Sequence, residues 1–206
     1  MLSRFQYRYL VSLIGDGYYD EPDEMILVYE YMPWGTLADH LHKLGKNYSA
    51  PLPWLGRLKI CIDAVRGLDY LYTGTSIQPG RAIHRDVKSS NFLLDDNWDA
   101  KISDFGLSRL GPEDQADSHE AGGGFERDEE QWGLAVWAQY CIGEGRVDEI
   151  IDASVREEIK KDCLMEFVQI ADECLHYFPR KRPTMAEVVV RPEFTHWQCR
   201  KEMTLL

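Results

Sequence analysis

The sequence has no long hydrophobic run, and no apolar stretch approaches the roughly 20 residues that a membrane-spanning helix requires. The first eight residues, Met1 to Arg8, also lack the hydrophobic core of a secretion signal. These two absences predict a soluble chain without a membrane segment, located in the cytoplasm.

No paired-cysteine pattern is present either. The five cysteines, Cys61, Cys141, Cys163, Cys174 and Cys199, include no Cys-x-x-Cys pair and have no histidine at metal-ligand spacing. An odd number without a framework is typical of a reducing compartment. Cys61, Cys163 and Cys174 fall in helical patterns, where we expect them to serve as small buried hydrophobic residues.

Positive charge is scarce. Lysine and arginine total 23 against 35 acidic residues, which gives a net charge of −12 and a pI near 4.9. Nucleic acid is therefore not expected as the main partner, and Arg180-Lys181-Arg182 is too short a basic run to change that. With 44% hydrophobic residues, the 206-residue chain is globular and long enough for one large domain or two small ones.

The most informative stretch runs from Ile83 to Gly106 and reads IHRDVKSSNFLLDDNWDAKISDFG. Its apolar positions predict two short strands, Phe92–Leu94 and Lys101–Ser103. The polar run Asp95-Asp96-Asn97 between them is typical of a turn. The stretch is therefore predicted to form a β-hairpin preceded by a polar loop.

Four polar side chains flank this hairpin. Asn91 lies just before the first strand and Asp104 just after the second, so the hairpin brings an amide oxygen and a carboxylate together. Such oxygens can share a hard cation such as Mg²⁺. In the preceding loop, the Asp86 carboxylate can accept a hydroxyl proton and the Lys88 ammonium can neutralise a phosphate.

These residues closely resemble two motifs of protein kinases. His84-Arg85-Asp86, Lys88 and Asn91 match the catalytic loop H-R-D-x-K-x-x-N, and Asp104-Phe105-Gly106 matches the D-F-G motif at the expected distance. Either tripeptide alone is usually chance, but all these positions occur here in order. The resemblance implies a site that uses Mg²⁺ and ATP.

The kinase resemblance gives each of these residues a role. Asp86 is expected to orient or deprotonate the acceptor hydroxyl, and Lys88 to stabilise the transferred phosphate. Arg85 is expected to meet a phosphorylated residue of the activation loop. Asn91 and Asp104 are expected to bind Mg²⁺.

Upstream, the apolar runs Tyr9–Ile14 and Met25–Tyr31 predict a second hairpin, joined by the polar segment Gly15–Glu24. Pro33 and Gly35 end its second strand. A new helix is predicted from three leucines at helical spacing, Leu37, Leu41 and Leu44.

The segment LVYEYMPWGTL at the end of this hairpin resembles the kinase hinge, which lies against adenine. The resemblance places Tyr29 at the gatekeeper position. It implies that the backbone of Glu30 and Met32 bonds the adenine edge, that Thr36 lies near the ribose, and that Leu93 forms the apolar floor under the ring.

Three further helices are predicted by apolar periodicity: Trp54–Tyr72, Trp132–Tyr140 and Cys163–Leu175. A last helix follows Pro183, where Thr184 and Glu187 have the spacing of a capping box. Between the first and second of these helices, the acidic and glycine-rich stretch 113–130 predicts a solvated loop.

The amino-acid sequence from about residue 2 to residue 190 is similar to that of plant receptor-like kinases of the malectin-domain (FERONIA-like) class. The stretches QWGLAVWA and RKRPTMAEVV carry this resemblance together with the hinge and the catalytic loop. It implies an ATP-dependent serine/threonine kinase with a protein substrate and a possible receptor-kinase partner. It also implies a place on the cytoplasmic side of a plasma-membrane receptor when the chain is part of a longer one.

Two blocks of the family pattern are absent from these 206 residues. There is no G-x-G-x-x-G loop and no V-A-I-K lysine to hold the nucleotide phosphates. Between His119 and about Glu129, the sequence EAGGGFER stands where the family has a D-P-E run and a central D-V-Y-S-F-G helix. Arg182 thereby loses the glutamate with which it pairs in the family.

We therefore expect an α+β, protein-kinase-like fold, mostly the helical C-lobe with a remnant of the N-lobe sheet. Residues 1–32 are assigned to a partial N-lobe and hinge, 33–192 to a partial C-lobe in which 113–130 replaces the missing block, and 193–206 to an irregular tail. The primary hypothesis is a truncated serine/threonine kinase with impaired activity. The alternatives are a non-catalytic pseudokinase fragment that acts as a binding module or decoy for a receptor kinase, and a fragment without a stable fold.

Overall fold

The structure is a computed structural model that describes residues 6–18, 25–42, 51–74, 82–110 and 129–191. Two compact units make up the chain. Unit 1 comprises residues 1–52 and 59–113, and unit 2 comprises residues 53–58 and 114–206. Helix α2 (Trp54–Thr73) contributes its first residues to unit 2 and the remainder to unit 1. Helices and small two-stranded sheets together confirm the expected α+β class.

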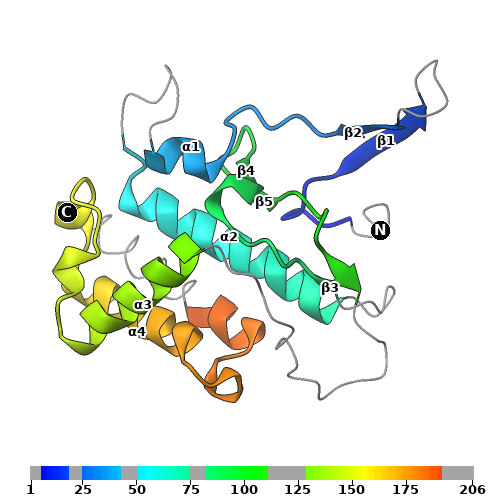
Figure 1. The fold of residues 1–206 in the computed structure, drawn as a ribbon. Coiled ribbons are helices and arrows are strands. Elements are labelled where there is room, and N and C mark those ends of the chain that lie inside the picture. Colours follow the sequence, from blue (N-terminus) through cyan, green and yellow to red (C-terminus); the bar gives the residue numbers. More distant parts are fainter. Residues whose placement is uncertain (1–5, 19–24, 43–50, 75–81, 111–128, 192–206) are drawn as a thin grey trace. The chain divides into compact units, whose positions relative to one another are not determined.

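In unit 1, strands β1 (Leu13–Tyr18) and β2 (Met25–Tyr29) form the antiparallel hairpin expected near the N-terminus (Figure 1). The predicted first strand was wrong in its position, because β1 begins at Leu13 and continues through residues that had been assigned to the turn. The register is irregular between Leu13 and Gly15. Residues 19–24 of the predicted turn lie outside the described part of the chain.

The apolar run from Tyr9 to Val11, which had been assigned to that strand, has a different partner. Its backbone bonds strand β5 (Ala100–Ile102): the Ile102 N–H donates to the Tyr9 oxygen and the Val11 N–H donates to the Ile102 oxygen, each at 2.9 Å. Tyr9, Leu10 and Val11 are all buried. Their hydrophobicity therefore serves the core of unit 1 rather than the hairpin.

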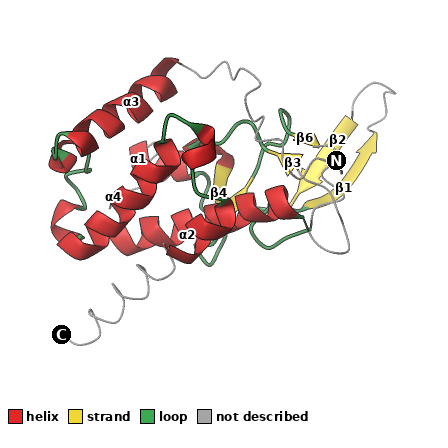
Figure 2. Cartoon of the chain, turned by 90° about the horizontal axis from the view of Figure 1, so that it is seen from below, coloured by secondary structure: helices red, strands yellow, loops and turns green. Residues whose placement is uncertain are grey.

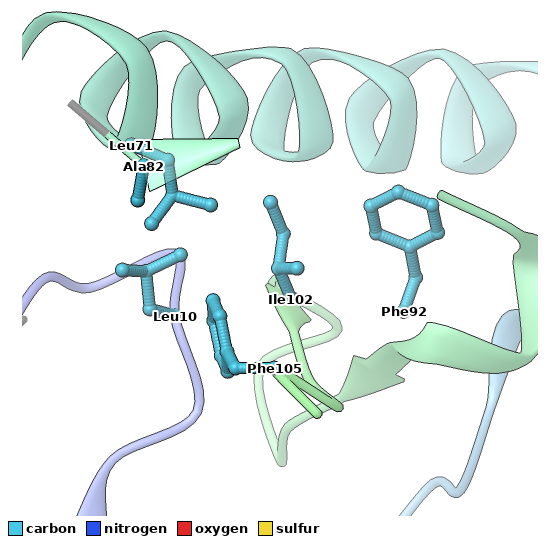
Figure 3. Packing of buried hydrophobic residues seen from close by; sticks show 6 residues of the cluster. All are labelled: Leu10, Leu71, Ala82, Phe92, Ile102 and Phe105. Carbon is cyan, nitrogen blue, oxygen red and sulfur yellow. The ribbon is translucent and has the colours of Figure 1, made fainter. Parts of the chain in front are cut away.

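The core of unit 1 lies along helix α2, whose predicted limits are confirmed to within one residue. Figure 3 shows the buried side chains of this core, which come from separate parts of the chain: Leu10, Leu71, Ala82, Phe92, Ile102 and Phe105. Gly67 allows the helix to approach closely, because a Cβ atom there would lie 2.7 Å from Ile102 Cδ1 and 3.0 Å from the Tyr9 oxygen.

The central hairpin consists of β4 (Phe92–Leu94) and β5, paired antiparallel with Leu93 opposite Lys101. The prediction is confirmed, with the second strand starting one residue earlier than expected. The Asp95 carboxylate closes the turn, since its Oδ1 accepts the N–H groups of Asn97 and Asp99, each at 2.9 Å. A short pair, β3 (Ala82–Ile83) with β6 (Arg109–Leu110), completes the sheets among the described residues.

Helix α1 (Leu37–His42) follows the hinge segment, as the leucine spacing predicted, although Leu44 lies outside the described residues. Thr36 and Asp39 start the helix. The Thr36 N–H donates to Asp39 Oδ2 at 2.9 Å, and the Asp39 N–H donates to Thr36 Oγ1 at 3.1 Å. Two orphan amides of the first turn are thereby satisfied.

Unit 2 contains helices α3 (Glu129–Gly143) and α4 (Lys161–Leu175), which pack against each other (Figure 2). The Gln139 amide donates to the Leu175 carbonyl oxygen at 2.9 Å. Both helices were predicted, and the buried residues of α4 are Cys163 and Ile170, whereas Cys174, which was also predicted to be buried, is only partly buried.

The remainder of unit 2 is built from short helical turns and one last helix. The turns are 3-10 segments, Val147–Glu149, Arg156–Glu158 and Pro179–Lys181. The last helix covers residues 185–191. Its predicted capping box is confirmed, because the Thr184 N–H donates to Glu187 Oε2 at 2.8 Å and the Glu187 N–H donates to Thr184 Oγ1 at 3.3 Å. Arg182 donates to the His176 carbonyl oxygen at 2.8 Å.

Some sequence expectations fall on parts of the chain without a described structure. The described residues do not include most of the predicted loop, residues 113–128, or the predicted tail, residues 193–206. Cys61, Cys141 and Cys174 are not disulfide-bonded, whereas Cys163 is, which corrects its assignment as a simple buried hydrophobic residue. None of the helices in the described ranges has the length and apolar character needed to span a membrane.

Candidate active site

The loop between β3 and β4 carries the predicted catalytic residues, and all of it belongs to unit 1. Its backbone contains Arg85 in the left-handed region with φ of 71°, and Asp104 after β5 has φ of 59°. Residues with a Cβ atom occupy this region rarely and at a cost of order 1 kcal/mol. The surrounding hydrogen bonds must therefore hold both positions in place.

Asp86 is at the centre of these hydrogen bonds. Its Oδ2 atom lies 2.8 Å from Lys88 Nζ and accepts the Asn91 side-chain amide at 2.9 Å. The same Asn91 amide donates to the Asp86 carbonyl oxygen, also at 2.9 Å. The hydrogen bond from Lys88 lowers the pKa of Asp86, and the bond from Asn91 adds to this effect. The carboxylate is thus kept ionised and is suited to orienting a hydroxyl group.

His84 holds the backbone of Asp86 by a hydrogen bond, a role that was not predicted from the sequence. The ring is buried, its Nδ1 accepts the Asp86 N–H at 3.2 Å, and its Nε2 is 2.9 Å from the Ser103 carbonyl oxygen. Since Nδ1 is an acceptor, these bonds assign the proton to Nε2, which donates to Ser103. The ring also contacts Phe105 edge-on at 5.2 Å between centroids. The signal was available, because His84 opens the H-R-D triplet.

The two predicted metal ligands lie on adjoining segments. The N–H and the hydroxyl of Ser103 both donate to the Asn91 carbonyl oxygen, at 2.8 and 3.0 Å, and Asp104 follows directly. Asn91 is buried and Asp104 is exposed. Because the Asn91 amide nitrogen is bound to Asp86, its side-chain oxygen is the atom left for a cation.

The donor set fits magnesium bound together with a phosphate ligand. The described residues contain no group of three or more histidine, cysteine, aspartate or glutamate side chains placed to hold a metal ion on their own. Mg²⁺ is usually held by one or two carboxylates, with substrate phosphates and water completing its shell. One amide oxygen and one carboxylate oxygen meet that requirement.

Two of the predicted adenine-binding residues, Thr36 and Leu93, meet at β4. Thr36 forms an isolated bridge with Leu93. The Trp34 N–H donates to the Leu94 oxygen at 3.2 Å, and the Leu94 N–H donates to the Gly35 oxygen at 2.9 Å. The hinge segment is thus attached to β4. The Thr36 hydroxyl donates to Asp39 Oδ2 at 2.7 Å, so it already serves as a helix cap, and its proximity to a ribose stays a prediction.

The backbone of the hinge segment offers one acceptor and one donor. The Glu30 N–H donates to the Ser12 oxygen at 3.0 Å, and the Met32 oxygen accepts the Gly35 N–H at 3.3 Å. Within the described ranges, the Glu30 carbonyl oxygen and the Met32 N–H form no hydrogen bond. Tyr29, at the end of β2, is 40% exposed.

The structure therefore brings most of the predicted residues into two groups joined by β4. Asp86, Lys88 and Asn91 form one hydrogen-bonded network, with Asp104 next to it through Ser103. Arg85 is exposed, and within the described ranges its side chain forms no ion pair. Thr36 and Leu93 form the second group, and Trp34 and Gly35 of the hinge segment bond Leu94.

Comparison with known proteins gives two findings. A family model described as protein tyrosine and serine/threonine kinase matches residues 1–127. Receptor-like protein kinase HERK 1 of Arabidopsis thaliana is 41% identical over 234 positions, which cover 94% of this chain and 27% of that protein. Receptor-like protein kinase FERONIA of the same plant is 38% identical over 234 positions, covering 94% and 25%.

These relatives are longer in two ways. The chain spans about a quarter of the length of the curated relatives that it matches. The aligned 234 positions also exceed the 206 residues of the chain, so HERK 1 and FERONIA carry internal positions that have no counterpart here.

Proposed function

The chain belongs to the protein tyrosine and serine/threonine kinase family, and from this premise we propose that unit 1 binds Mg²⁺ and ATP for phosphoryl transfer to serine or threonine hydroxyls of a protein. The proposal is based on two contacts of the Asp86 carboxylate, an ion pair with Lys88 and a hydrogen bond from the Asn91 amide. This fixes one ionised carboxylate between a cation and an amide, as a residue that orients an acceptor hydroxyl requires.

Each group then has a chemical task. Asp86 orients the hydroxyl, and Lys88, at 2.8 Å from it, carries positive charge to the place where the phosphoryl group is transferred. Asn91 and Asp104 supply oxygen ligands for Mg²⁺, which neutralises phosphate charge when bound. The Glu30 carbonyl and the Met32 N–H are the acceptor and donor for the adenine edge, above Leu93.

Phosphoryl transfer depends on positioning and on charge stabilisation, with little covalent participation of protein groups. The 206 residues contain neither a glycine-rich phosphate loop nor its partner lysine. We therefore propose that this polypeptide binds Mg-ATP but transfers phosphate weakly or not at all. In a longer chain it would form part of the cytoplasmic side of a receptor, as suggested by its similarity to receptor-like kinases.

The test is titration of the purified chain with a fluorescent ATP analogue, with MgCl₂ and with EDTA. We expect binding that requires Mg²⁺, and a loss of about tenfold or more in affinity on Asp104→Asn because the negative charge that faces the cation is removed. The matched control is Asp162→Asn, an exposed aspartate at the start of α4. Binding that ignores both Mg²⁺ and Asp104→Asn would reject the proposed site.

Turnover is measured separately, with a generic protein substrate and labelled ATP. Weak or absent phosphorylation is the expected result. Strong phosphorylation that Asp104→Ala abolishes would overturn the expectation of impaired activity while supporting the assigned residues.

A second candidate, a non-catalytic binding module or decoy for a receptor kinase, is favoured by one observation in unit 2. Helix α3 exposes large apolar side chains that normally lie in interfaces: Leu134 is 63%, Tyr140 55% and Trp137 44% exposed. Under this hypothesis the chain binds a purified receptor-like kinase domain without turnover, and Trp137→Gln weakens that binding. Binding that is unaffected by Trp137→Gln would argue against α3 as the contact.

A further inference from the structure

One ion pair in unit 1 joins the residue after β2 to strand β5. Lys101 Nζ lies 2.6 Å from Glu30 Oε2, and the two side chains are only 15% and 25% exposed. The other carboxylate oxygen, Glu30 Oε1, accepts the Ser12 N–H at 2.7 Å. Burial alone would raise the pKa of Glu30, but the bonds from Lys101 and Ser12 lower it overall. Both oxygens are thus bound and the carboxylate is ionised.

Lys101 lies in the middle of β5, opposite Leu93 of β4. Strand β5 directs Ala100 and Ile102 into the core, so Lys101 lies on the opposite face. Its cross-strand partner is Leu93, and paired residues in antiparallel strands share a face. The lysine therefore lies beside the residue proposed as the floor under adenine, three positions before Asp104.

The strand that leads to Glu30 has few packing contacts with the rest of unit 1. Four consecutive residues of β2 are at least 40% exposed, so apolar packing holds the end of this strand only weakly: Ile26, Leu27, Val28 and Tyr29. The backbone N–H of Glu30 donates to the carbonyl oxygen of Ser12, the residue just before β1. In the described part of the chain, the bond to Lys101 is the polar contact that joins residues 25–31 to β5.

We propose that Lys101 is a positioning residue that acts through Glu30. By holding the Glu30 carboxylate, it fixes the backbone of residues 30–32 at a set distance from the strand that leads to Asp104. The adenine contacts and the metal ligand are thereby kept in one geometry. The functional part of this inference rests on the proposed nucleotide site.

The first measurement does not need a ligand. Hydrogen exchange of the backbone amides of residues 25–32 is followed in the whole chain and in Lys101→Met. We expect exchange to become about fivefold faster, which corresponds to loss of a partly buried ion pair. Lys161→Met, at an exposed lysine of α4, is the matched control and leaves the rate unchanged.

Two further variants separate charge from packing. Lys101→Arg keeps the cation and retains slow exchange. The double variant Lys101→Glu with Glu30→Lys reverses the pair and restores part of the protection, whereas each of its single variants is as fast as Lys101→Met. Restoration by the reversed pair is not expected if Lys101 only fills space.

The second measurement is affinity for Mg-ATP and for Mg-tripolyphosphate, which has no adenine. Lys101→Met is expected to lower the affinity for Mg-ATP by about fivefold and to leave the affinity for Mg-tripolyphosphate unchanged, because only the adenine contacts depend on the hinge. An equal loss for both ligands would overturn the role in adenine positioning.

The outcomes distinguish this inference from the proposed function. Unchanged exchange in all the Lys101 and Glu30 variants refutes the positioning role, whatever the nucleotide does. If exchange responds but the unaltered chain binds no adenine nucleotide, the proposed function fails, and Lys101 positions the hinge without serving adenine binding.

Discussion

The buried histidine of the catalytic loop joins two parts of the candidate site. His84 bonds Asp86 on one side and Ser103 on the other, and so connects the loop to the segment that ends in Asp104. In His84→Ala, the partly buried Asp86 N–H and Ser103 carbonyl lose their partners. Each unsatisfied buried group costs about 1 to 3 kcal/mol.

We therefore predict that His84→Ala lowers the free energy of unfolding by about 2 to 4 kcal/mol and also abolishes Mg-dependent nucleotide binding. Urea denaturation and the fluorescent titration measure the two effects. The matched control is His42→Ala, at the exposed end of α1, for which both values stay close to those of the unaltered chain. Retained nucleotide binding in His84→Ala would show that the imidazole does not support the site.

Sequence spacing sufficed to predict that Asp86, Lys88 and Asn91 come together, because they lie within six residues of one another. It did not predict the left-handed backbone at Arg85 and Asp104. Neither is a glycine, and local sequence gives no reason for a conformation that only the surrounding contacts stabilise. The capping role of the Thr36 hydroxyl was also missed, although its partner Asp39 is only three residues away.

At the scale of elements, the two interior glycines Gly67 and Gly133 should respond in opposite ways to the same substitution. In α2, an alanine Cβ at position 67 would meet Ile102 Cδ1 at 2.7 Å and the Tyr9 oxygen at 3.0 Å. In α3, a Cβ at position 133 would have no atom within 4 Å. The helix preference of alanine over glycine, about 1 kcal/mol, applies to both.

We predict that Gly67→Ala destabilises the chain by about 1 to 3 kcal/mol, since overpacking outweighs helix preference, and that Gly133→Ala stabilises it by up to about 1 kcal/mol. Thermal or urea unfolding of the two variants, measured side by side, is sufficient. A stabilising Gly67→Ala would mean that α2 does not approach β5 as closely as described.

Helices and strands were predicted correctly where the residues that determine them are close together in the sequence. Helices α2 and α4 have an apolar stripe along their own sequence, and the β4–β5 hairpin has a short polar turn, so their limits were found within two residues. The run Tyr9–Val11 looks like a hairpin strand, but its partner Ile102 is far along the chain. Periodicity reports which residues prefer burial and cannot report against what they are buried.

For the whole molecule, net charge and apolar exposure act in opposite directions. The charge of −12 causes repulsion between copies, whereas the exposed apolar residues on β2 and α3 favour association. Salt screens the repulsion over about 8 to 10 Å at physiological ionic strength and leaves the apolar attraction in place.

We therefore predict that self-association increases as salt is raised, and that Trp137→Gln with Tyr140→Gln reduces it at every salt concentration. Sedimentation velocity over a series of protein concentrations measures this. As a control, Tyr177→Gln removes an aromatic ring that is 81% exposed elsewhere in unit 2. Association that falls with salt would indicate that ion pairs, and not apolar contacts, join the copies.

The contact between the first described residues and β5 has a consequence for synthesis of the chain. Arg8 bonds Asp99 across 91 residues, and Leu10 packs into the same region. At a translation rate of about 5 to 20 residues per second, Leu10 waits roughly 5 to 20 seconds for its partner to be made. During that interval the buried side chains of Tyr9, Leu10 and Val11 are available to chaperones, so the earliest part of unit 1 to leave the ribosome is among the last to pack.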